Sequence, residues 1–400
     1  MPSINPQLEQ LDADNYSLIL QFCQQIPLSR DKKSLAISEK EQVKLSKLAI
    51  KVLEKGEFQE KWEISKIIPL LGQKILQSLI DLVEDETQTI ETTWFVLRLL
   101  GKFPTTSAVL TLVSVLKKNS EPELTAIAVK SLSQIGTRAI ADLARLIQNS
   151  DDCLAAVQAL ACIRTVKTIP ALIQASNYRQ AQIRAIAIEA LGSFHKPEIV
   201  ALLISSLQDT SSIVRKEAVI ALGMRWDLAE QYDLVSKIQP LLYDLNLEVC
   251  KVAAIALGRM NNEQAAEVLA EALFSTYTPI SLKKSIIKGL SWIKNKQALE
   301  YLGRALFLND SSLCLQIIRV LGQETISDLS SNATQILLNF GNSSTQISQQ
   351  TQIKQSLAMS LGELKQTSAV ATLEKLSLDA EKSVRLHAIA ALKKLTLQAD

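Results

Sequence analysis

The chain has 400 residues, of which 47% are apolar and 21% are charged, so it is too apolar for a disordered chain and can form a continuous core. Its 43 basic and 41 acidic residues give a formal net charge of +2, far from the strongly basic balance of a dedicated nucleic-acid binder. Five scattered cysteines without a C-x-x-C pair fit neither a disulfide framework nor a zinc site and indicate a reducing compartment.

The N-terminal segment differs from the rest of the chain. Its first residues, MPSINPQLEQLDADNYS, contain no basic region followed by an apolar run, and no stretch of about 18 apolar residues occurs anywhere. We therefore expect a soluble, cytoplasmic protein without a membrane span. The stretch KEQVKLSKLAIKVLEKG has helical periodicity but contains no copy of the repeat described below. We expect an atypical helical N-terminal cap over residues 1–63 and a repeat array over residues 64–400.

The array repeats one helix many times. The motif is clearest as VRKEAVIALG from Val214, VCKVAAIALG from Val249 and VRLHAIAALK from Val384. We call the leucine near the end of each copy the anchor leucine, and the helix that contains it the motif helix. Intervals between anchors run from 28 residues (Leu132 to Leu160) to 40 residues (Leu321 to Leu361), a period typical of helical repeat proteins. The anchors are Leu100, Leu132, Leu160, Leu191, Leu222, Leu257, Leu290, Leu321, Leu361 and Leu392.

Small and apolar residues lie eight, four and one positions before the anchors, which is one face of an α-helix. In the copy that ends at Leu222 they are Val214, Ala218 and Ala221. We expect the alanines to let the neighbouring motif helix approach closely. Glycine directly follows six anchors, and we expect it to adopt the left-handed conformation of a helix end. These glycines are Gly101, Gly192, Gly223, Gly258, Gly322 and Gly362.

A second amphipathic segment follows each motif helix, such as PEIVALLISSL from Pro197, so each repeat is a helical hairpin. A hairpin of this kind cannot bury both faces alone, and neighbouring hairpins must cover it. The fold class predicted is therefore all-α, an α-α superhelix of about ten hairpins. Two insertions interrupt the period: MRWDLAEQYD around Trp226, and the uncharged polar stretch GNSSTQISQQTQ from Gly341 to Gln352, which we expect to be a flexible loop.

The V-R-x-x-A-x-x-A-L-G helix, followed by a helix such as TIPALIQAS, resembles the HEAT repeat over about residues 64–396. Intervals of 31 residues, as between Leu160 and Leu191, make it most similar to the short phycobilisome-lyase HEAT-like repeat. The resemblance implies that the motif helices line a concave face, and that an Arg-Asp ladder joins neighbouring repeats. The matching residues lie seven and thirteen positions before the anchors: Arg184, Arg215, Arg385, Asp209, Asp244 and Asp379.

The sequence contains few residues and motifs that could support catalysis. His195 and His387 are the only histidines, which excludes the iron-binding His-Glu pairs of the similar deoxyhypusine hydroxylases. No phosphate loop, dinucleotide-binding glycine turn or nucleophile elbow occurs. Cys250 and Cys314 occupy the motif position that Arg215 holds in its repeat, which favours structural thiols. We expect no catalytic residue, metal or cofactor.

Basic residues recur on the motif helices outside the core positions. Lys216, Lys251 and Lys284 lie six residues before their anchors, and Lys288 and Arg319 lie two before theirs. Stacked repeats would align them into a basic stripe that contacts an acidic protein surface or an anionic ligand such as a bilin propionate. A merely solvated face is the alternative, and the acidic neighbours of the stripe favour it. Nucleic acid is disfavoured, because no continuous phosphate track is present.

Tryptophans are the remaining candidates for contact with a partner. Trp94 and Trp292 lie within or at the end of motif helices, and we expect them to serve packing. Trp226 lies in an insertion, where exposure would make it an anchor for a partner. The sequence thus predicts a non-catalytic protein-protein interaction scaffold or assembly factor that uses the concave face. The alternative, implied by the resemblance alone, is a phycobilin lyase subunit or a chaperone for a bilin or phycobiliprotein of the phycobilisome.

Overall fold

The computed structural model describes residues 8, 11, 14–27, 35–118, 121–149, 153–343 and 345–396, and the regular elements in these ranges are helices. The all-α fold class is confirmed. Contacts group the chain into two compact units, Met1–Phe194 and His195–Asp400, which are described separately below. The boundary expected at residue 63 stays a prediction. Among the described residues, no helix is both long and apolar enough to cross a membrane.

The first unit begins with a helical segment that contains no motif helix. Within it α3 packs against α4, and α4 in turn contacts the first motif helix, α6. A capping box starts α3, because Ser38 and Glu41 accept from each other's backbone N–H groups. The first residues, 1–7, lie outside the described part of the chain. The helices are α2 (Tyr16–Gln25), α3 (Glu39–Lys55), α4 (Phe58–Ile67), α5 (Leu76–Glu84), α6 (Ile90–Leu100), α7 (Thr106–Lys118), α8 (Pro122–Ile135), α9 (Ile140–Asn149), α10 (Leu154–Ile163), α11 (Ile169–Ala175) and α12 (Ala181–Gly192).

The second unit contains six motif helices, the even-numbered helices from α14 to α24. Side chains of the preceding turns cap several of them, as predicted: Asp310 Oδ1 accepts from the N–H of Leu313 at 2.9 Å at the start of α20. The helices are α13 (Pro197–Ser206), α14 (Ser212–Gly223), α15 (Leu234–Ile238), α16 (Leu247–Met260), α17 (Glu263–Phe274), α18 (Ile280–Trp292), α19 (Lys296–Ala305), α20 (Ser311–Leu321), α21 (Ser327–Gly341), α22 (Thr351–Leu364), α23 (Val370–Leu376) and α24 (Lys382–Thr396).

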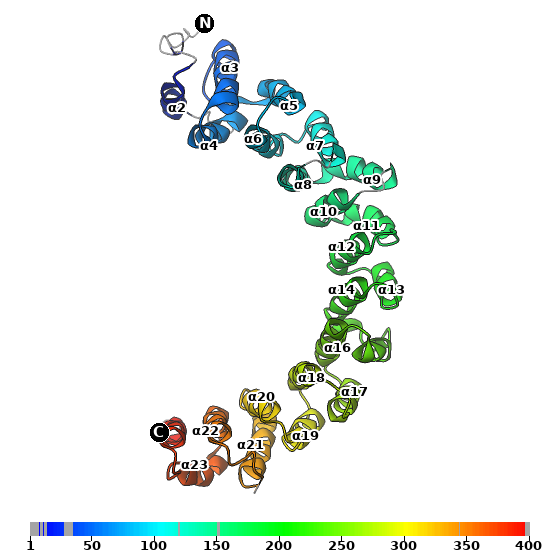
Figure 1. Cartoon of the computed structure of the whole chain (residues 1–400), viewed down its shortest axis with the longest axis vertical. Coiled ribbons are helices and arrows are strands. Elements are labelled where there is room, and N and C mark those ends of the chain that lie inside the picture. The colour runs from blue at the N-terminus through cyan, green and yellow to red at the C-terminus, as the bar shows by residue number, and fades with distance from the viewer. Residues whose placement is uncertain are drawn as a thin grey trace. The chain divides into compact units, whose positions relative to one another are not determined.

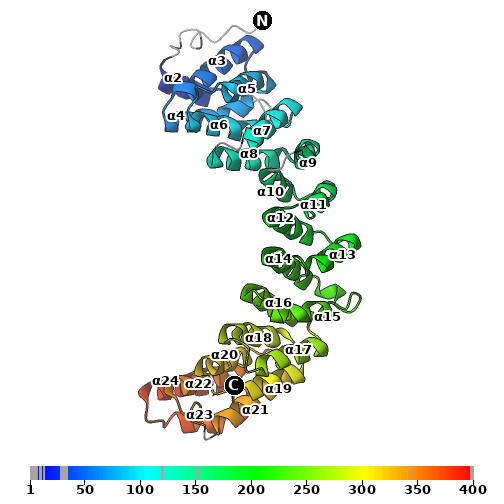
Figure 2. The same cartoon turned by 45° about the vertical axis from the view of Figure 1, so that its right-hand side comes forward.

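Each unit consists of two layers of helices. The motif helices form one layer and the remaining helix of each hairpin forms the other, so that in the second unit α14, α16, α18, α20 and α22 lie on the inner side of the curve of that unit (Figure 1). The turned view shows these motif helices lying side by side (Figure 2). Each of them packs on the next motif helix along the chain. A side chain at a given motif position therefore lies near its counterparts in the neighbouring repeats.

The predicted core positions are buried. Nine of the ten anchor leucines are buried, and Leu392 is half-buried because α24 is the last described helix and no further repeat covers it. Val214, Ala218 and Ala221 are likewise buried at their spacing of eight, four and one before Leu222. Burying one leucine stabilises the fold by about 1.5–3 kcal/mol, so the seam of anchors is a main source of stability.

The conformation expected for the glycines after the anchors is wrong. Of the glycines that the structure describes, only Gly72 and Gly136 have a positive φ, and neither follows an anchor. A Cβ on Gly223 would instead lie 2.8 Å from Cβ of Ala256, and one on Gly258 would lie 2.5 Å from Cα of Gly289. Gly101, Gly322 and Gly362 face the small residue before the next anchor in the same way. Glycine occupies this position because two motif helices touch there, and a side chain would hold them apart.

The two insertions adopt regular turns. Around Trp226 the chain forms a short 3-10 helix, Trp226–Leu228, ahead of the short helix α15. In the polar loop, Ser348 is buried and its hydroxyl donates to the carbonyls of Ser343 and Thr345 at 2.8 and 2.9 Å. Helix α22 begins at Thr351, inside the expected loop, and Ser344 lies outside the described residues. The flexibility of this loop stays a prediction.

Replacing Gly258 by alanine tests the close contact between α16 and α18. The new Cβ would meet the backbone of Gly289 at 2.5 Å, which side-chain rotation cannot relieve. We expect Gly258→Ala to lower the free energy of unfolding by about 1–3 kcal/mol in chemical denaturation. Gly303→Ala in α19 is the matched control, since its Cβ meets only the movable Cγ2 of Ile336 at 3.0 Å. It should be neutral or stabilising, because alanine favours helix by up to about 1 kcal/mol over glycine. Equal stability of the two variants would contradict the packing role.

Candidate binding surface

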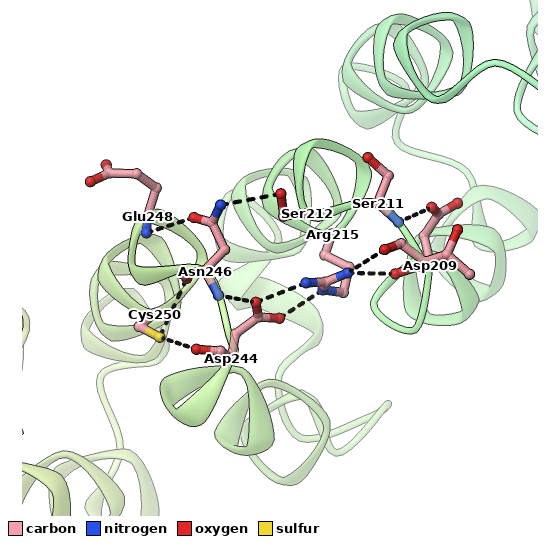
Figure 3. Close-up of polar contacts among 9 residues, drawn as sticks. Asp209, Ser211, Ser212, Arg215, Asp244, Asn246, Glu248 and Cys250 are labelled. Atoms are coloured by element: carbon pink, nitrogen blue, oxygen red, sulfur yellow. Dashed lines mark hydrogen bonds and ion pairs between the residues drawn. The ribbon is translucent and has the colours of Figure 1, made fainter. Parts of the chain in front are cut away.

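An ion pair joins two repeats of the second unit (Figure 3). Arg215 on α14 donates from Nε to Oδ2 of Asp244 at 2.7 Å and from Nη2 to Oδ1 at 2.8 Å. Its Nη1 also donates to the carbonyls of Asp209 and Thr210, at 2.7 and 3.1 Å. The side chains of Arg215 and Asp244 are only 15% and 6% exposed. This bidentate pair is the ladder contact that the family resemblance implied, and it leaves neither group available to a partner.

The position seven residues before the anchor has the same role in other repeats. Lys354 holds it on α22 and donates to Oδ2 of Asp379 at 2.9 Å, which joins α22 to the turn before α24. Arg184 and Arg385 each donate from Nη1 to the carbonyls six and five residues before them, within 2.9 Å. Where cysteine replaces the arginine, the thiol does the same: Sγ of Cys250 lies 3.1 Å from the carbonyl oxygen of Asp244. Arg184, Arg385 and Cys250 therefore hold the turn ahead of their own helix, whereas Lys354 joins two repeats.

The ladder carboxylates are ionised more readily than free aspartates. The hydrogen bonds from Arg215 hold the pKa of Asp244 below its ordinary value, although partial burial acts in the opposite direction. The pKa of Asp379 is also lowered, first by the N–H of Glu381 and then by Lys354. In both turns the carboxylate also accepts from the N–H two residues further on, as in the 2.8 Å bond from Asn246 to Asp244. Both are structural groups.

The five basic residues of the expected stripe lie on the motif helices, but they are not equivalent. Lys216 and Lys251 are half-buried and pair with glutamates of their own helices, Lys216 with Glu217 at 3.5 Å and Lys251 with Glu248 at 2.8 Å. Their charges are thus partly neutralised. The other three, Lys284, Lys288 and Arg319, are exposed, and in the part of the chain that the structure describes none of them makes an ion pair.

Helices α18 and α20 concentrate this exposed positive charge, although Asp310, which caps α20, interacts with Lys284. Their sequences, ISLKKSIIKGLSW and SSLCLQIIRVL, contain four basic residues and no carboxylate. One of the four, Lys283, is buried, which leaves Lys284, Lys288 and Arg319 on the surface of the motif-helix layer. The stripe is therefore strongest at α18 and α20 and weaker toward α14.

A hollow of about 530 Å³ opens at the C-terminal ends of α14, α16 and α18. Trp226 is 61% exposed at its rim, and Met224 is 58% exposed. Trp292 also lines it, and Gly223 and Gly258 contribute no side chain to it. We expected Trp226 to contact a partner only if it is exposed. It is exposed, and its contact with a partner stays a prediction. Trp292, expected to serve packing, also lines this hollow.

A second hollow, of about 590 Å³, lies between α20, α22 and α24. Its lining is mixed: Leu315 and Met359 contribute apolar surface, and the polar side chains are Arg319, Gln323, Gln355, Glu363 and His387. The Nδ1 atom of His387 lies 2.7 Å from the carbonyl oxygen of Ser383, and Glu363 pairs with Lys394. Arg319 thus connects the basic stripe to this hollow.

Comparison with known proteins agrees with the repeat architecture. HEAT repeats match residues 76–161 and 169–239, and a PBS lyase HEAT-like repeat matches residues 249–275. The chain contains HEAT repeats. No curated protein matches it over its sequence.

Solved structures similar to this HEAT-repeat chain include three importin-type solenoids. The structure of Kap121p bound to Pho4p is 14% identical, with 95% of this chain and 51% of that chain covered and a TM-score of 0.51. The Kap95p structure with RanGDP is 12% identical, covering 97% and 53%, with a TM-score of 0.52. Importin beta is 14% identical, covering 97% and 62%, with a TM-score of 0.52. At this level of identity the similarity shows the fold alone, and the chain spans little more than half of each importin-type chain.

The cysteines of the HEAT-repeat chain behave as structural groups. Burial raises the pKa of Cys23 to about 12 and that of Cys314 to about 11, so neither thiol is ionised near neutral pH. Cys153 and Cys250 are also buried, whereas Cys162 is exposed. Within the described ranges, no group of three His, Cys, Asp or Glu side chains is placed to hold a metal ion.

The row that residues two positions after the anchors form was missed by the sequence analysis, although Trp292 itself was expected to serve packing. Met224, Arg259 and Trp292 hold this position in three successive repeats, and all three line the first hollow. Nη1 of Arg259 lies 2.9 Å from Sδ of Met224, and its guanidinium lies 5.6 Å from the ring centre of Trp292. The sequence does contain this information, because residues at the same distance from their anchors lie in one row on the stacked helices.

A double-mutant cycle on Arg215 and Asp244 tests the ladder. From the buried, bidentate geometry we expect a coupling free energy of about 1–3 kcal/mol in denaturant unfolding of Arg215→Ala, Asp244→Ala and the double variant. The control cycle uses Lys251 and Glu248, which pair on the surface of one helix with exposures of 29% and 66%. Its coupling should be about 0.5 kcal/mol or less. Equal coupling in the two cycles would show that the ladder does not join repeats.

The same pair predicts a pH dependence. The pKa of Asp244 is lower in the folded chain than in the unfolded chain, so its stabilisation is present above the unfolded value of about 3.9 and is lost as pH falls toward the folded value. Asp244→Asn should be less stable at pH 7 and lose less stability between about pH 5 and pH 3 than the wild type. Asp328→Asn, at an exposed site of α21, should follow the wild-type curve. If the stability of Asp244→Asn falls with pH in parallel with that of the wild type, the ion pair of Asp244 does not stabilise the fold.

Proposed function

We propose that this HEAT-repeat chain is a non-catalytic interaction scaffold whose motif-helix layer in the second unit binds an acidic protein surface. The observation that supports it most directly is the exposed positive charge of Lys284, Lys288 and Arg319 on α18 and α20, of which only Lys284 interacts with a carboxylate, that of Asp310, among the described residues. Three exposed cations in adjacent repeats, without carboxylates on their helices, favour association with a surface of opposite charge.

The repeat architecture suits this function. Stacked motif helices present one long row of side chains, and their spacing is fixed by packing. The ladder uses the charges of Arg215 and Lys354, seven residues before their anchors, so the stripe residues are a separate set. The importin-type structures named above contain protein partners, Pho4p and RanGDP. By analogy of fold we infer that this chain also holds a protein.

The second candidate function is that of a phycobilin lyase subunit or a chaperone for a bilin or phycobiliprotein, and one observation favours it. The PBS lyase HEAT-like repeat spans residues 249–275, which includes most of α16 and all of α17. Lys251 and Arg259 lie on α16, and cations of this kind would bind the propionates of a bilin. Under this reading the protein would purify with visible absorbance when bilin is present.

Charge reversal tests the scaffold proposal. We expect the triple variant Lys284→Glu, Lys288→Glu and Arg319→Glu to reduce capture of the partner from native lysate by about 10-fold or more, because three attractions become repulsions. The control variant reverses Lys237, Lys296 and Lys375, which are exposed on α15, α19 and α23 in the other layer. Circular dichroism checks that both variants stay helical. Equal capture by both would show that the stripe is a solvated face.

An absorption spectrum of the captured complex separates the two candidates. A colourless complex with a stoichiometric acidic protein supports the scaffold. A bilin band that the triple variant loses would instead support the chromophore-binding reading.

A further inference from the structure

The hollow at the ends of α14, α16 and α18 combines flat apolar groups with unpaired cations. Trp292 has two cations near its ring, with the Arg259 guanidinium at 5.6 Å and Nζ of Lys288 at 5.4 Å from the ring centre. Arg259 in turn contacts Met224, and Trp226 stands exposed at the rim. Three successive repeats thus contribute to one site of about 530 Å³, within the range of about 300–1,000 Å³ that is typical of binding pockets.

The charge at this site is positive and available. In the portion of the chain that the structure describes, neither Arg259 nor Lys288 makes an ion pair. The nearby Arg225 differs, because it is only 7% exposed and donates from Nε and Nη2 to Asp227 at 3.2 Å. That pair neutralises itself and positions the turn that carries Trp226. The cations left over are therefore those beside the aromatic rings.

We propose that this hollow binds an aromatic side chain of a partner peptide whose flanking residues are acidic. The proposal rests on the proposed scaffold function and names the segment that the scaffold recognises. The partner ring packs between Trp226 and Trp292 over Met224, where large apolar area is buried at little cost in side-chain entropy. The flanking carboxylates pair with Arg259 and Lys288, and with Lys284 one turn before Lys288.

Nucleic-acid bases also stack on tryptophan, so a single-stranded oligonucleotide is the competing occupant. Arg259 and Lys288 both lie beside the ring of Trp292, and two cations at one ring do not form a continuous track for phosphates. The hollow therefore favours a short acidic peptide over a nucleic acid.

Fluorescence anisotropy with defined peptides tests the proposal on the full-length protein. The probe is the fluorescein-labelled peptide DEDDFDDED, and its two controls replace either the phenylalanine by alanine or all acidic residues by their amides. A labelled single-stranded oligonucleotide of mixed sequence is the fourth probe. We expect the first peptide to bind at least 10-fold more tightly than either control peptide and than the oligonucleotide.

Variants of the protein locate the site. Trp226→Ala should weaken binding of the acidic aromatic peptide about 10-fold, and Arg259→Gln about 5-fold. Tyr277→Ala is the matched control, an aromatic residue that is 94% exposed in the turn before α18 and outside the hollow. It should leave the affinity unchanged. Since Trp226 is exposed, its replacement should not disturb folding, which the helical spectrum confirms independently.

Each outcome has a defined meaning. If the alanine peptide binds as tightly as the phenylalanine peptide and the triple charge variant abolishes both, the stripe binds acidic surfaces but the hollow does not read an aromatic residue. In that case the proposed function stands and the inference fails. Tighter binding of the oligonucleotide, no binding of the acidic aromatic peptide, or unchanged affinity in Trp226→Ala also overturns the inference.

Discussion

The architecture depends on the close contact between successive motif helices at the glycine that follows five of the anchor leucines. There a glycine of one repeat meets the small residue before the next anchor, as Gly223 meets Ala256 and Gly258 meets Gly289. At these separations the hairpins have one way to stack, and the anchors on either side are fully covered. In a repeat array, stability is roughly the sum of such nearest-neighbour contacts, so each contact also fixes the register of its neighbours. The rows of surface residues follow from that register.

Register also separates structural charges from available charges. Successive residues of an α-helix are rotated by about 100°, so the position seven before the anchor and the position six before it lie on different faces. Arg215 at the first position is buried in the ladder with Asp244, whereas Lys216 beside it lies at the surface and contacts Glu217. Of these two neighbouring basic residues, one joins two repeats and the other lies on the surface. The net charge of +2 does not show this distinction, because it counts structural and surface charges alike.

Much of this was predictable from the sequence, because the repeat pattern is set by packing. The recurring spacing identified the anchors and the small residues. The resemblance to HEAT repeats implied the Arg-Asp ladder, which is found between Arg215 and Asp244. The glycine conformation was not predictable, since a glycine after a helix serves a left-handed turn or a close contact, and only the neighbouring repeat decides which. The pairing of Lys251 with Glu248 depends on side-chain rotamers that the spacing does not determine. The row that contains Arg259 and Trp292 was missed because the motif ends at the glycine, one residue before that row.

The row two residues after the anchors changes character along the second unit. It begins with Met224, Arg259 and Trp292 around the first hollow and continues with Gln323 and Glu363 beside the second. Glu363 is paired with Lys394, so the later part of the row offers hydrogen bonds and little net charge. The row therefore presents aromatic rings and cations at the ends of α14, α16 and α18, and a glutamine and a paired glutamate at the ends of α20 and α22. Packing fixes the spacing of the row, and the residues placed on it set its chemistry.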